Sequence, residues 1–199
     1  MNFRELALED RLALKERAKS RTLTEMWRDL PPSSTDDWSP RTRLAAEMLT
    51  GVDTVADIGC GSMELERLLP NAVYWPIDCV ARDPRTIVVD LNKEPPPQVS
   101  ARTVTLLGVL EYIIDAPKLL RSLAALYPQL LISYNIAERR CEADQEWYVW
   151  VNDYSRADLE DLFSKCGYSI EKTCDLGPQV LWLLKSDRCY GPASRHDPS

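Results

Sequence analysis

The sequence predicts an α/β domain built on one mostly parallel sheet of seven strands, with helices on both faces and an antiparallel hairpin at the C-terminal end. Three observations predict this fold. Short apolar runs alternate with stretches of helical periodicity, which is typical of parallel α/β sheets. The length of 199 residues suits one domain with its own core. The last two apolar runs are separated only by residues 175–178, which favours a hairpin.

The composition is that of an ordinary globular chain. Hydrophobic residues make up 45% and charged residues 28%, which excludes a mainly disordered chain, a collagen-like chain and a membrane bundle. The net charge of −7 disfavours nucleic-acid binding through overall charge, because phosphates are repelled. No run of about 18 apolar residues predicts a membrane span, and the mixed charges near the N-terminus resemble neither a secretory signal nor a transit peptide. We therefore expect a cytoplasmic protein.

The cysteines are expected to be reduced thiols. None is part of a Cys-x-x-Cys pair, and the single histidine, His196, lies in the C-terminal tail. Without Cys/His clusters at ligand spacing, we expect no metal site. The six cysteines are Cys60, Cys79, Cys141, Cys166, Cys174 and Cys189.

The N-terminal part is expected to be a helical extension over residues 1–38. Residues 3–28 are charged and helix-favouring and contain neither glycine nor proline, so they predict one amphipathic helix. The prolines that follow predict a loop. The next helix is expected to have Ser39 as its N-cap, Pro40 in its first position and Gly51 after its end. We expect the core domain over residues 39–187 and a flexible tail over residues 188–199.

Within the core, strands and helices are expected to alternate. Asp115 is expected to cap a helix that contains Pro117 in its first turn, and Ser155 with Asp158 forms a capping pattern before a helix ended by Gly167. The leucines at helical spacing in these stretches predict core packing. Strands are expected at residues 54–58, 73–77, 86–89, 103–107, 129–134, 168–174 and 179–184.

A glycine turn follows the first strand, in Asp57-Ile-Gly-Cys-Gly-Ser-Met63. A turn between a strand and a helix exposes backbone N–H groups at the sheet edge where open α/β sheets bind ligands. A dinucleotide fingerprint needs a third glycine at position 64, but Glu64 stands there and its carboxylate opposes a pyrophosphate. Asp57 instead suits a ligand with an ammonium or sulfonium charge.

These residues resemble the class I S-adenosylmethionine-dependent methyltransferases, which have a Rossmann-like fold, over about residues 40–185. The resemblance begins with V-A-D-I-G-C-G, where Asp57, Gly59 and Gly61 match the family's first motif. It implies that the glycine turn lies against the methionine part of the cofactor. Met63 departs from the pattern, since many members carry a third glycine there.

Three further motifs extend the resemblance. Asp78 lies 21 positions after Asp57, and the family's acid at this place binds the ribose hydroxyls. Asp90 matches an acid beside the adenine, and the stretch Leu107-Gly-Val-Leu-Glu-Tyr112 matches the segment after the fourth strand. The cofactor-binding residues implied are Asp57, Gly59, Gly61, Asp78, Cys79, Asp90, Leu91, Leu107 and Gly108.

Methyl transfer chiefly requires alignment of acceptor, methyl group and sulfur, and a general base is optional. Without histidine in the core, the candidate catalytic residues are Glu111 and Tyr134, near the carboxyl ends of the fourth and fifth strands. A cofactor-side or helix-capping role for Glu111 stands as the alternative.

A long polar and aromatic segment follows the fifth strand, and such a segment at a ligand-binding edge favours a role in binding. Its spacing resembles small methyltransferases of polysaccharide and natural-product pathways. Alternatively, its aromatic residues pack the segment onto the sheet. Trp38 is expected to close over the cofactor. The acceptor-binding residues expected are Trp38, Tyr112, Arg140, Trp150 and Asn152.

The sequence therefore predicts a methyltransferase that uses S-adenosylmethionine to methylate oxygen or nitrogen of a small molecule or a sugar unit. The alternative is a scaffold protein in which this fold binds a partner through the charged N-terminal helix. Nucleic-acid methylation is disfavoured, because the chain lacks a basic stripe and an Asn/Asp-Pro-Pro-Tyr/Phe motif. We expect no nucleic-acid or membrane partner, and the N-terminal helix is compatible with a homodimer.

Overall fold

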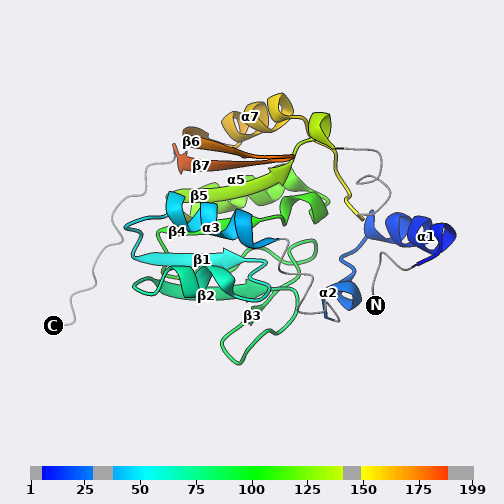
Figure 1. Cartoon of the computed structure of the whole chain (residues 1–199), viewed down its shortest axis with the longest axis horizontal. Coiled ribbons are helices and arrows are strands. Elements are labelled where there is room, and N and C mark those ends of the chain that lie inside the picture. The colour runs from blue at the N-terminus through cyan, green and yellow to red at the C-terminus, as the bar shows by residue number, and fades with distance from the viewer. Residues whose placement is uncertain (1–5, 29–37, 141–148, 188–199) are drawn as a thin grey trace.

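The computed structural model describes residues 6–28, 38–140 and 149–187, and its centre is a seven-stranded sheet (Figure 1). The strand order is β3-β2-β1-β4-β5-β7-β6. The first five strands run parallel, and β7 lies antiparallel between β5 and β6. The predicted fold class is confirmed. The strands are β1 Thr54–Ile58, β2 Val73–Asp78, β3 Ile87–Val88, β4 Thr103–Leu107, β5 Gln129–Asn135, β6 Tyr168–Leu176 and β7 Gln179–Ser186.

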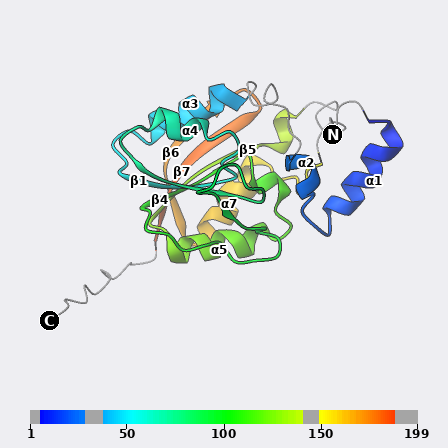
Figure 2. The ribbon, with the colours of Figure 1, turned by 90° about the horizontal axis from the view of Figure 1, so that it is seen from below.

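Helices cover both faces of the sheet, with α3 and α4 on one side and α5 and α7 on the other (Figure 2). Each pair packs on its own apolar cluster, because alternate residues of a strand face opposite sides. On β1, Val55 packs with the α3 and α4 side, and Ala56 and Ile58 pack with the other side. The helices are α1 Leu8–Ala18, α2 Thr24–Arg28, α3 Ser39–Met48, α4 Glu64–Leu68, η3 Leu110–Tyr112, α5 Ala116–Leu126, η4 Ala137–Arg139 and α7 Arg156–Lys165.

The expected single helix over residues 3–28 is wrong, since the described part forms two helices, α1 and α2. Thr22 and Leu23, which lie between them, make tertiary contacts. Leu23 is buried, and the Thr22 hydroxyl donates to Asp90, which draws the chain out of helical geometry. Together these contacts bring α2 to the carboxyl edge of the sheet, whereas α1 lies outside it (Figure 2).

Local signals at the other helix ends are largely confirmed. Asp115 accepts a hydrogen bond from the Lys118 N–H at 3.0 Å, and Ser155 and Asp158 form a capping box. At α3 the prediction is wrong by one residue. Trp38 is the N-cap, and Ser39, the first helical residue, donates to Glu64 Oε2 at 2.9 Å instead.

Among the described residues, no disulfide bond joins Cys60, Cys79, Cys166 or Cys174. Cys141, Cys189 and His196 lie outside the described residues, as does the tail from residue 188. Within the described ranges, no helix is long and apolar enough to cross a membrane.

Candidate active site

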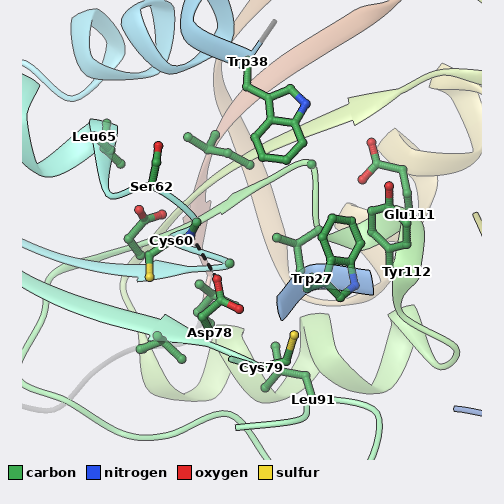
Figure 3. Close-up of a pocket in the computed structure, with 18 of the residues that line it drawn as sticks. Trp27, Trp38, Cys60, Ser62, Leu65, Asp78, Cys79, Leu91, Glu111 and Tyr112 are labelled. Atoms are coloured by element: carbon green, nitrogen blue, oxygen red, sulfur yellow. Dashed lines mark hydrogen bonds between the residues drawn. The ribbon is translucent and has the colours of Figure 1, made fainter. Parts of the chain in front are cut away.

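A cavity of about 840 Å³ opens at the carboxyl ends of the central parallel strands (Figure 3). All nine predicted cofactor-binding residues line it. Four of the other predicted site residues also line it, namely Trp38, Glu111, Tyr112 and Trp150. The remaining three, Tyr134, Arg140 and Asn152, are not part of its lining.

The glycine turn after β1 carries three residues with left-handed backbone. Gly59 and Gly61 have φ of +74° and +50°. A Cβ added to Gly59 would lie 2.3 Å from Val109 Cγ2, so this position has no room for a side chain. Met63 has φ of +54°, although it is not glycine. The chain therefore keeps a left-handed conformation at the position where many family members carry the third glycine.

Asp78 ends β2 beside this turn. Its Oδ2 accepts the Gly61 N–H at 3.0 Å and the Arg82 Nε–H at 3.2 Å, and its Oδ1 accepts the Val80 N–H at 3.1 Å. A carboxylate offers about four acceptor sites, and these bonds occupy three of them. Asp78 is buried, with only 5% of its surface exposed.

Asp57 lies under the same turn and is buried. It accepts hydrogen bonds from the hydroxyls of Thr105 and Tyr74, which belong to the neighbouring strands β4 and β2. Burial raises the pKa of Asp57 to about 6, although both hydroxyls act to lower it. Each carboxylate oxygen of Asp57 therefore accepts one hydrogen bond, and these bonds form a polar network at the floor of the cavity.

The N-terminal segment is bound to the cavity through Asp90 and Asn92. The Thr22 hydroxyl donates to Asp90 Oδ1, and Asn92 Nδ2 donates to Thr22 Oγ1 and to the Tyr112 carbonyl at 2.9 Å each. Lys93 Nζ lies 2.8 Å from Asp90 Oδ2. Asp90 therefore holds the segment that leads into α2, while the next residue, Leu91, faces the cavity.

Trp27 of α2 covers the cavity, and sequence reasoning missed it. Its carbonyl accepts from Arg82 Nη1 at 3.0 Å, and its ring lies edge-on to Tyr112 with centroids 4.7 Å apart. Arg82 thus joins Asp78 to the N-terminal segment. The only sequence signal was a tryptophan in an otherwise charged helical stretch, and nothing in it indicated contact with Arg82.

Arg41 of α3 is a second missed residue. It lies in the cavity lining and is 9% exposed. Its Nη1 packs so closely on Gly108 that a Cβ there would lie 2.3 Å away. Its Nε has no hydrogen-bond partner among the residues described, and Glu111 is its strongest opposite charge. One arginine at the start of a helix gave no sequence signal for a buried cation.

Glu111 is 1% exposed, and its two oxygens differ. Oε1 accepts from the Asn135 backbone N–H at 3.0 Å and from Asn135 Nδ2 at 3.1 Å. Oε2 is buried without a hydrogen-bond partner in the described part of the chain. Glu111 therefore combines a structural contact to the end of β5 with one buried acceptor that no described residue pairs.

Tyr134 lies away from the cavity and is fully buried. Its hydroxyl donates to Asn152 Oδ1 at 2.6 Å and accepts the Tyr154 N–H at 3.1 Å. Burial raises its pKa to about 12. The structure therefore does not place this hydroxyl where a base for the acceptor is needed.

The side chains of Arg140 and Asn152 also make contacts with other parts of the protein. The Arg140 guanidinium lies 4.3 Å from the Trp150 ring centroid and 5.2 Å from that of Tyr134. Asn152 Nδ2 donates to the carbonyls of Leu110 and Ile113 at 2.8 and 2.9 Å, which fixes η3. These contacts match the alternative interpretation, in which the aromatic segment packs onto the sheet.

A family model described as a methyltransferase domain matches residues 14–173. The chain belongs to this methyltransferase domain family. The resemblance inferred from the sequence is thereby confirmed, and S-adenosylmethionine is the cofactor of such domains. A search of curated proteins gave no match.

Solved structures with the same fold include several methyltransferases. Mitomycin 7-O-methyltransferase MmcR superposes with a TM-score of 0.64 and 17% identity, covering 90% of this chain and 67% of MmcR. A putative methyltransferase in complex with the Trm112 activator from Haloferax volcanii superposes with a TM-score of 0.60 and 15% identity. The match covers 79% of this chain and 97% of that protein. The O-methyltransferase NcsB1, in complex with S-adenosylmethionine and 2-hydroxy-5-methyl naphthoic acid, superposes with a TM-score of 0.55 and 17% identity. The chain covers 60% of NcsB1, and NcsB1 covers 80% of this chain.

Proposed function

We propose that this domain transfers a methyl group from S-adenosylmethionine to oxygen or nitrogen of a small molecule or a sugar unit. One observation carries the proposal: the left-handed turn at Gly59, Gly61 and Met63 is hydrogen-bonded to Asp78 at the mouth of a large cavity. The turn and the Asp78 carboxylate therefore line the same space. S-adenosylmethionine, when bound, supplies a methyl group made electrophilic by a sulfonium.

The lining residues fit this cofactor in charge and hydrogen-bonding capacity. The open acceptor site on Asp78 suits a ribose hydroxyl. Arg41, buried with an unpaired Nε among the described residues, suits the carboxylate of the methionine part. Leu91 offers apolar surface next to Asp90. Met63 adopts a left-handed backbone conformation, which glycine also adopts readily.

The N-terminal extension serves as a cover in this proposal. The Trp27 carbonyl accepts a hydrogen bond from Arg82, and the Thr22 hydroxyl donates one to Asp90. Arg82 and Asp90 both line the cavity. Excluding water strengthens the electrostatic contacts inside such a site and limits side reactions. A homodimer formed through the N-terminal helix stays a prediction. Leu8 and Leu12 are exposed on α1, which is compatible with it.

Calorimetric titration with S-adenosylmethionine and S-adenosylhomocysteine tests the proposal. Binding by the wild type is expected, and Arg41→Met is expected to weaken it about tenfold or more, because charge-assisted hydrogen bonds are lost. Arg43→Met, on the exposed side of the same helix, is the matched control. If the wild type binds neither compound, the scaffold alternative replaces the enzyme.

A further inference from the structure

Two acceptor oxygens in the cavity lack hydrogen-bond donors among the described residues. One is Glu111 Oε2, on a side chain that is 1% exposed. The other is Oε1 of Gln179, which also lines the cavity and is buried at that atom. Buried acceptors are costly to leave unpaired, so each marks a place where an N–H or O–H of a ligand is expected.

Asn135 is a neighbour of both of these side chains. It stands directly opposite Gln179 in the pairing of β5 with β7, and opposed residues of an antiparallel pair project from the same face of the sheet. The Asn135 side chain also donates to Glu111 Oε1 at 3.1 Å. Glu111 and Gln179 are therefore both neighbours of one asparagine side chain, which itself lines the cavity.

Aromatic side chains surround the space beside Glu111. Trp38, Trp27 and Tyr112 come from three different segments and all line the cavity. Figure 3 shows Trp27 and Tyr112 on the side of the view where Glu111 lies, and Trp38 between that side and Ser62 of the glycine turn. Flat aromatic walls favour a flat ring, through stacked or edge-on contacts.

We infer that the acceptor is a primary aromatic amine, an inference that rests on the proposed function. An amine carries two hydrogens on one nitrogen, and these can serve Glu111 Oε2 and Gln179 Oε1 together, whereas a hydroxyl serves only one. The nitrogen lone pair forms the bond to the methyl carbon as the carbon–sulfur bond breaks and its electrons stay on sulfur. One proton of the methylated nitrogen then passes to Glu111 Oε2.

Three ring probes of matched shape test this inference on protein loaded with S-adenosylhomocysteine: 1-naphthylamine, 1-naphthol and 1-methylnaphthalene. Calorimetry is expected to give the tightest binding for the amine, about tenfold tighter than for 1-methylnaphthalene. Glu111→Gln and Gln179→Met are each expected to reduce that preference. Glu94 is an exposed acid outside the cavity lining, and Glu94→Gln is the control that is expected to retain the preference for the amine.

Equal binding of the three probes, tighter binding of the naphthol, or no binding of the amine overturns the inference. The same holds if the amine preference survives in the two site variants. Thermal melting identifies a variant that fails to fold, and if Glu111→Gln does so, Gln179→Met decides. Failure to bind S-adenosylhomocysteine overturns the proposed function and this inference with it, whereas binding without amine preference overturns the inference alone.

Discussion

The Gly61 backbone N–H donates to Asp78 Oδ2 at 3.0 Å, so the turn after β1 is fixed to the acid that ends β2. Because β1 and β2 are parallel and paired, both groups stand at the same edge of the sheet. This contact aims the carboxylate at the cavity and orders the turn at the same time. Changes at Asp78 therefore affect the cofactor site at two points.

Asp78→Asn is expected to weaken binding of S-adenosylhomocysteine about ten- to hundredfold, since hydrogen bonds to a charged acceptor are lost. Calorimetric titration measures the change. Asp53→Asn, exposed and just before β1 at the opposite edge of the sheet, is the control and is expected to bind like the wild type. Unchanged affinity in Asp78→Asn would remove this residue from the cofactor site.

Met63→Gly is expected to be more stable than Met63→Ala by about 1 kcal/mol. Both substitutions remove the side chain, but only glycine adopts a φ of +54° without strain. Urea unfolding of the two variants measures the difference in the free energy of unfolding. Equal stability would show that the left-handed conformation of Met63 costs little.

Asp57 is expected to make the folded state less stable as the pH rises from 3.8 to about 6. Its pKa in the folded state, about 6, exceeds the ordinary value of 3.8, so the folded chain binds more protons in this range. Stability then falls with increasing pH. Asp57→Asn, which does not titrate, should lack this decrease in urea unfolding measured across the range. The same decrease in both proteins contradicts the assignment.

Arg82→Met is expected to loosen the N-terminal segment, because the hydrogen bond to the Trp27 carbonyl and the contact with Asp78 are both lost. Hydrogen exchange of the α2 amides should become about tenfold faster, while that of α5 stays unchanged. Arg85→Met, which removes an exposed arginine paired with Glu66 and Asp83, is the matched control. If α2 exchange stays at the wild-type rate, Arg82 does not hold the segment.

Periodicity and capping residues sufficed to predict the sheet and most helix ends. Ser155 with Asp158 and Asp115 with Lys118 act within one turn of chain, so neighbouring residues determine them. The break between α1 and α2 could not be predicted in this way. It depends on Thr22 reaching Asp90, which is 68 positions away.

The candidate site likewise contains residues that the sequence predicted and residues that only distant contacts place there. The nine residues predicted for the cofactor all line the cavity, because each lies at or just after the carboxyl end of a parallel strand and such ends meet at one edge of the sheet. For the acceptor the outcome was mixed. Tyr134, Arg140 and Asn152 hydrogen-bond or stack with protein groups outside the cavity lining, whereas Arg41 and Trp27 reach the cavity without any motif around them.

The sequence by itself determined the fold, the family and the edge of the sheet where the cofactor site lies, since these follow from local patterns and the order of strands. Only the tertiary structure decided which polar atoms stay unpaired. Whether Glu111 Oε2 or the Tyr134 hydroxyl is free depends on partners distant in sequence, here Asn135 and Asn152. A side chain's chemistry is set by its residue type, but its availability is set by what packs against it.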